Sequence, residues 1–125
     1  MLVLTRYIAQ HELKPLRKFL TIDDLLEGAK KVKKGLAVAL RKPVDLAQVS
    51  FYKIRIGKKQ GARMIVFMKS EKQSVVPVLI RLKSDKMLGM NMSAGNKTVN
   101  LQIKKNLSHI VEDIQQKKFE EFSLS

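Results

Sequence analysis

Residues 51–67, FYKIRIGKKQGARMIVF, decide the predicted fold because they contain two short strands joined by a turn. In the first strand, apolar side chains on one face alternate with Lys53 and Arg55 on the other. The turn, GKKQG, carries Lys58 and Lys59 between two glycines. The second strand is apolar on both faces after Arg63, which predicts a central position in a sheet. No acidic residue lies in this stretch, so we expect a sheet with uncompensated positive charge.

Further strands and two helices are predicted on either side of this hairpin. A strand over 75–83 ends with Arg81 and Lys83, and residues 1–9 predict a first strand. Helical apolar spacing runs over 22–40 behind Thr21 as N-cap, and a second amphipathic helix is predicted over 98–119. We therefore expect one α+β domain over 1–125, with helices on one face of a small antiparallel sheet of about four strands. Its other face would display the basic side chains.

Positive charge dominates the composition and is concentrated in the middle of the chain. The sequence has 25 Lys and Arg against 11 Asp and Glu, a net charge of +14. Residues 48–86 alone contain ten basic and two acidic side chains. This balance favours a polyanionic partner such as a nucleic acid. An acidic protein partner remains a further possibility.

Several classes of chemistry find no support in the sequence. There is no Cys, so disulfide and thiolate chemistry are excluded. His11 and His109 lie far apart in the sequence, and we expect neither a metal site nor a cofactor. No Walker-type phosphate loop or G-x-S-x-G motif is present. No segment has the length of a membrane span or the form of a secretory leader, so we expect a cytoplasmic protein with no membrane partner.

A cluster of Lys and Arg can do two kinds of chemistry on RNA. It can bind phosphates, because Arg offers a bidentate fork and Lys a point charge. It can also assist cleavage without a metal, since the 2′-hydroxyl of RNA is the nucleophile, a neutral Lys can accept its proton and Arg can stabilise the charge on phosphate. The composition favours binding alone but leaves cleavage open.

The order of elements and the core FYKIRIGKKQGARMIVFM…VPVLIRLKSDK resemble the RelE/HigB-type toxins of the RelE/ParE superfamily, from bacterial type II toxin–antitoxin systems. The resemblance covers 36–114 well and the N-terminal third in outline. It implies a compact α+β toxin with a basic concave sheet face, which cuts mRNA on the ribosome and is neutralised by a cognate antitoxin. Other branches of the superfamily act on gyrase and lack a nuclease site. A non-nuclease toxin or a non-catalytic nucleic-acid-binding module is therefore the alternative.

The resemblance also assigns roles to individual residues. Lys53 or Arg55 would be the base or orienting cation, and Arg63 the phosphate clamp. Lys83 and Lys86 match the family's basic positions around the end of the last strand of the meander, Lys83 as a catalytic and Lys86 as an RNA-binding candidate. Some members place an Arg just past that strand; here the nearest basic residue is Arg81, displaced from that point, and it is a further catalytic candidate. Lys58 and Lys59, at the tip of the turn, are expected to attract and bind RNA. The family's downstream aromatic or His has no counterpart in 86–96. A base-stacking residue is thus unassigned.

Overall fold

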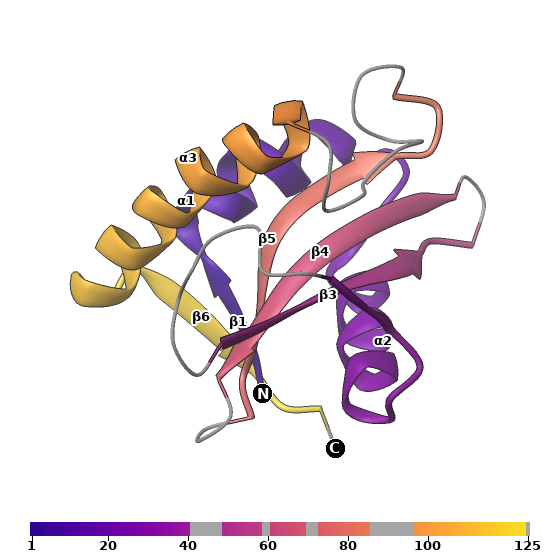
Figure 1. The fold of residues 1–125 in the computed structure, drawn as a ribbon, viewed down its shortest axis with the longest axis horizontal. Coiled ribbons are helices and arrows are strands. Elements are labelled where there is room, and N and C mark those ends of the chain that lie inside the picture. The colour runs from indigo at the N-terminus through magenta and orange to yellow at the C-terminus, as the bar shows by residue number, and fades with distance from the viewer. Residues whose placement is uncertain (41–48, 59–60, 70–72, 86–96, 125) are drawn as a thin grey trace.

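The computed structural model describes residues 1–40, 49–58, 61–69, 73–85 and 97–124, and the fold is α+β (Figure 1). The predicted sites Lys59 and Lys86 lie outside these residues, as does the rest of the segment 86–96. The elements in chain order are β1 (Leu2–Thr5), α1 (Arg6–Ile8), the π-helical turn η1 (Ala9–Leu13), the 3₁₀ turn η2 (Lys14–Leu16), α2 (Ile22–Lys33), β2 (Val38–Leu40), β3 (Val49–Ile56), β4 (Ala62–Lys69), β5 (Val75–Leu82), α3 (Lys97–Gln115) and β6 (Phe119–Phe122).

The sheet is larger than the sequence predicts and is of mixed type. Within the described residues it has six strands in the order β2-β3-β4-β5-β1-β6. The meander β3-β4-β5 is antiparallel as predicted, and β6 runs antiparallel to β1. In contrast, β1 pairs with β5 in parallel, through Leu2 and Val75. The prediction of a four-stranded antiparallel sheet was therefore wrong in strand number and in the direction of this one pair.

The two additional strands exist because both long helices end earlier than their apolar spacing suggests. Helix α2 stops at Lys33 in a Schellman motif, in which Gly35 N–H donates to Val32 O at 3.1 Å and Leu36 N–H to Lys31 O at 2.9 Å. Gly35 takes the left-handed φ of 76° that this motif needs. The chain after it is therefore available to form the edge strand β2.

Helix α3 ends in the same motif without a glycine. Lys117 N–H donates to Ile114 O at 3.1 Å and Lys118 N–H to Asp113 O at 2.8 Å. Lys117 itself has φ 58°, a left-handed conformation that costs a residue with a Cβ about 1–2 kcal/mol. This stop releases β6 to pair with β1, and no residue type in the sequence signals it.

We expect Lys117→Gly to raise the free energy of unfolding by about 1 kcal/mol, because glycine adopts positive φ without the steric penalty. Urea denaturation followed by circular dichroism measures the change. Lys118→Gly is the matched control, since the next residue has no positive φ and should lose stability on the same change. Equal effects of the two substitutions would contradict the assignment of strain to Lys117.

Helix α2 begins and packs as its sequence dictates. Thr21 forms a capping box with Asp24: its hydroxyl accepts from Asp24 N–H at 3.4 Å, and the Asp24 carboxylate accepts from Thr21 N–H at 2.9 Å. At Gly28 the helix lies directly on the sheet, where a Cβ would be 2.6 Å from Ile56 Cγ2 and 3.0 Å from Met64 Cε. The predicted N-cap is thus confirmed, and α2 covers the Ile56 face of β3 and β4.

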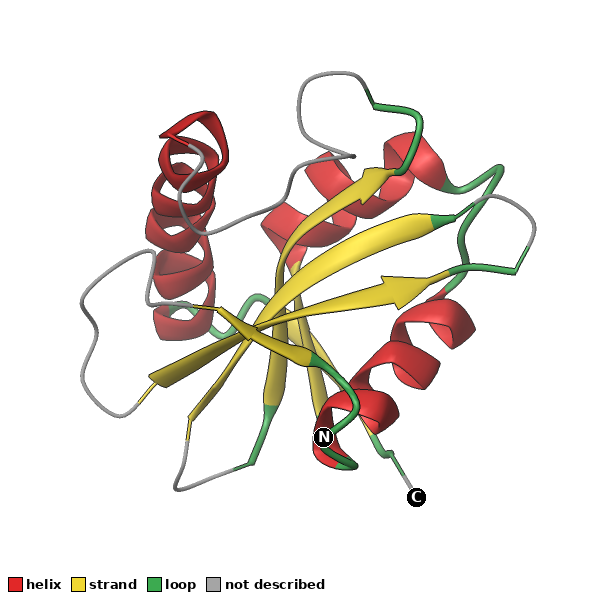
Figure 2. Cartoon of the chain, turned by 45° about the vertical axis from the view of Figure 1, so that its right-hand side comes forward, coloured by secondary structure: helices red, strands yellow, loops and turns green. Residues whose placement is uncertain are grey.

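The opposite face of the sheet is also covered, which corrects the expectation of helices on one face. Side chains of β4 and β5 that point away from α2 are buried as well, with Ile65 and Leu79 both 0% exposed. In Figures 1 and 2, α2 and α3 lie on opposite sides of the strands. Asn106 of α3 is fully buried and donates from Nδ2 to Val78 O of β5 at 2.7 Å. None of the described helices is long and apolar enough to cross a membrane.

Candidate nucleic-acid interface

Strand register brings three arginines into one row across the sheet. Arg55 of β3 is directly opposite Arg63 of β4, and Arg63 is directly opposite Arg81 of β5. Residues paired in this way project from the same face, with Cβ atoms about 4.5–5.5 Å apart. We call Arg55, Arg63 and Arg81 the arginine row. The row lies where β3 and β5 end and β4 begins.

Two lysines extend the row into a larger basic surface. Lys53 precedes Arg55 by two residues in β3 and therefore shares its face. Lys83 follows β5, and its N–H donates to Gly61 O at 2.8 Å, which continues the ladder one step beyond Arg81. The arginine row, Lys53 and Lys83 together form what we call the cationic face. The register thus brings together all five residues predicted as catalytic.

Exposure differs between the members of the cationic face. Arg55 and Lys83 are exposed, and Lys53 and Arg63 are half-buried. Like charges directly opposite one another on a sheet are destabilising, so this arrangement costs folding free energy. A phosphate group accepts hydrogen bonds from guanidinium forks, so this surface is chemically suited to an anion.

Carboxylates of the protein itself neutralise Arg81. Its Nη1 contacts the Oε1 atom of Glu12 and donates to Ile80 O at 2.9 Å, and its Nε lies 3.8 Å from Asp85 Oδ2. The Glu12 side chain is 3% exposed and that of Arg81 is 20% exposed. These contacts reduce the availability of the Arg81 guanidinium to a ligand.

Glu12 holds Arg81 at the part of the β5 edge that is not paired with β1. β1 pairs with β5 at Leu2 and then turns into helix at Arg6, so among the described residues the later part of β5 has no parallel strand beside it. There the Glu12 carboxylate accepts the Ile80 N–H at 2.7 Å. One carboxylate thus takes the place of a neighbouring strand and orients the last arginine of the row.

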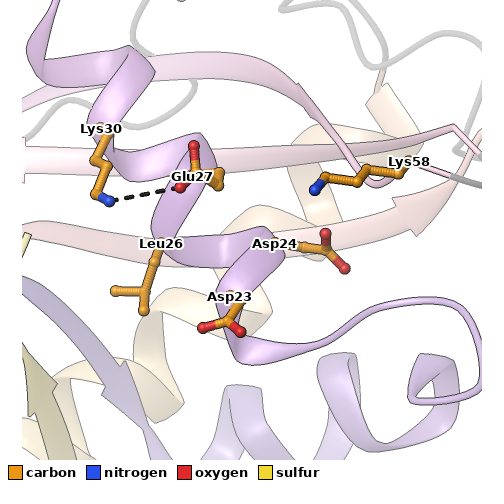
Figure 3. A pocket seen from close by; sticks show the side chains of 6 residues that line it. All are labelled: Asp23, Asp24, Leu26, Glu27, Lys30 and Lys58. Carbon is orange, nitrogen blue, oxygen red and sulfur yellow. Dashed lines mark hydrogen bonds and ion pairs between the residues drawn. The ribbon is translucent and has the colours of Figure 1, made fainter.

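Lys58, predicted to bind RNA, lies at a different place. Its side chain lines a hollow of about 470 Å³ beside the first turn of α2. Figure 3 shows its ammonium group pointing toward α2, where Asp23, Asp24 and Glu27 line the same hollow. These carboxylates attract the Lys58 charge, so the structure groups Lys58 with α2 rather than with the arginine row.

The structure also brings His11 and His109, which lie far apart in the sequence, onto the same tyrosine ring. The Tyr7 ring stacks on His109 with centroids 4.0 Å apart and an interplanar angle of 1°, and on His11 with centroids 4.4 Å apart and an angle of 29°. The i,i+4 spacing of Tyr7 and His11 is a helical signal that could have predicted their contact. The contact with His109 depends on how α1 docks on α3, which the sequence does not reveal.

Comparisons with protein-family models, with curated proteins and with solved structures found no match.

Proposed function

We propose that the protein binds RNA through the cationic face and acts as the toxin of a type II toxin–antitoxin system that cleaves translated mRNA. The arginine row is the observation that carries the proposal, because opposed guanidinium groups on one sheet face are suited to the phosphates of a polyanion. The resemblance to RelE/HigB-type toxins supports the choice of mRNA on the ribosome. It also supports a cognate antitoxin as the second partner.

The residues of the cationic face divide the proposed chemistry between them. Lys53 accepts the proton of the 2′-hydroxyl, whose oxygen then bonds to the adjacent phosphorus while the bond to the 5′-oxygen breaks. Arg55 and Arg63 stabilise the charge that develops on the phosphate oxygens. Arg81, fixed by Glu12, keeps the arginine row aligned. Lys83, just beyond the end of β5, attracts the RNA strand. The 5′-oxygen takes up a proton from solvent as it leaves, and Lys53 returns its proton to solvent, so the products are a 2′,3′-cyclic phosphate and a 5′-hydroxyl.

Expression of the protein in bacteria, together with a reporter mRNA, tests this proposal. We expect growth arrest and new 5′ ends within the reporter, mapped by primer extension. A reporter without its start codon is the control and should stay intact, because cleavage is proposed to need translation. If growth stops without new ends in the translated message, the nuclease assignment is wrong.

A non-catalytic nucleic-acid-binding module, or a non-nuclease toxin that uses the same face, is the second candidate. The engagement of Arg81 by Glu12 favours it, because this interaction reduces the number of arginines available to a transition state. This candidate predicts RNA binding that weakens steeply with salt, without any cleavage product. Incubation of RNA with the protein and ribosomes, followed by electrophoresis, distinguishes the two.

A further inference from the structure

The stack of His11, Tyr7 and His109 has an arrangement that leaves one ring exposed. The two imidazole rings lie 4.4 and 4.0 Å from the same phenol ring, nearly parallel to it. Over one face of Tyr7 they would overlap each other, so they must lie on opposite faces. Tyr7 is the middle ring, and it and His109 are half-buried, whereas His11 is exposed. The exposed part of His11 therefore lies outside its contact with Tyr7.

The docking of α1 on α3 accounts for the positions of Tyr7 and His109. It does not require the ring of His11. Tyr7 N–H donates to the Asp113 carboxylate at 2.7 Å, and the Tyr7 ring stacks on His109, so α1 is held to α3 by these contacts. His11 adds a ring on the outside of this contact, where it buries little surface. An exposed aromatic ring with one supported face is the arrangement on which nucleic-acid bases stack.

The chain links this ring directly to the cationic face. His11 immediately precedes Glu12 in η1, and Glu12 holds Arg81 of the arginine row. Exposed basic residues flank the stack as well: Arg6 precedes Tyr7, Lys14 follows His11 by three residues, and Lys105 precedes His109 by one helical turn. Proteins that bind single-stranded nucleic acid combine such basic tracks with aromatic stacking.

We propose that His11 stacks on a base of single-stranded RNA whose phosphates are bound by the cationic face. The inference rests on the proposed function, since the phosphates bring the strand to this end of the sheet. It adds a base-binding surface that the basic residues cannot supply, because phosphate contacts are insensitive to the presence of a base. His109 and Tyr7 are the support of this surface, and His11 is the ring that the base contacts.

Binding of two fluorescently labelled oligonucleotides, measured by anisotropy, tests the inference. One is single-stranded oligouridylate and the other has the same length and phosphates but abasic sugars. We expect wild-type protein to bind the oligouridylate roughly five- to a hundredfold more tightly, as one base–aromatic stack contributes about this factor. In His11→Ala this preference should vanish while binding of the abasic strand is unchanged. His11→Phe should retain the preference, because it keeps a ring and loses the imidazole.

The possible outcomes separate this inference from the proposed function. If His11→Ala retains the preference for bases, or if His11→Phe loses it, stacking on His11 is refuted although phosphate binding stands. If wild-type protein binds neither strand at low salt, the proposed function fails and the inference with it. Thermal unfolding of both variants serves as the control, and unchanged melting temperatures are expected since His11 is exposed.

Discussion

Glu12→Ala is expected to lower the free energy of unfolding by about 3–5 kcal/mol, the usual cost of removing one partner of a buried ion pair. The substitution leaves Arg81 without its buried partner and the Ile80 N–H of β5 without its acceptor. Domains of this size are stable by only about 5–15 kcal/mol, so this is a large fraction of the total. Urea denaturation measures the loss as a lower midpoint at an unchanged slope.

Two further variants show whether the loss comes from the buried pair. Glu27→Ala removes an acidic side chain that is 63% exposed and pairs with Lys30 at the surface, and it should change stability by less than about 1 kcal/mol. The double substitution of Glu12 by Leu and Arg81 by Met should recover part of the loss, because an apolar pair leaves no buried charge unpaired. If Glu12→Ala is no more costly than Glu27→Ala, Glu12 does not replace a strand at the β5 edge.

The parts of the fold that the sequence predicts are those governed by local rules. The alternation in 51–67 fixes the faces of β3, and the capping box at Thr21 fixes the start of α2. The left-handed turn at Lys117 and the parallel pairing of β1 with β5 depend on tertiary contacts. For that reason the two edge strands and the mixed sheet could not be predicted from spacing alone.

The candidate site was predictable in composition but not in its internal organisation. Alternation alone places Lys53 and Arg55 on one face, and the meander brings Arg63 beside them. The neutralisation of Arg81 depends on a contact between residues 69 positions apart, Glu12 and Arg81. The contact of Tyr7 with His109 likewise joins opposite ends of the chain. Sequence spacing carries no information about either contact.

Replacing Arg55 and Arg63 together by Gln is expected to weaken RNA binding roughly a hundredfold at low salt, since each charge-assisted hydrogen bond contributes about 1.5 kcal/mol. Both residues lie on the cationic face, and both are proposed to contact phosphate oxygens. The plot of log affinity against log salt should become less steep by about 1.4, because each phosphate contact on a single strand contributes about 0.7. Fluorescence anisotropy over a salt series measures both quantities.

The matched control removes the same charge from another surface. Lys31 and Lys34 are exposed at the end of α2, and their joint replacement by Gln also lowers the net charge by two. If binding follows net charge alone, both double variants will lose affinity and salt dependence equally, and the cationic face has no special part in binding. We expect the lysine variant to keep most of its affinity, because α2 lies on the other side of the sheet from α3 (Figure 2) and covers the face opposite the arginine row. The arginine variant should also unfold at the same urea concentration as the wild type or at a higher one, since removing two opposed like charges relieves repulsion within the sheet. A loss of binding without a loss of stability would then identify Arg55 and Arg63 as residues retained for their ligand.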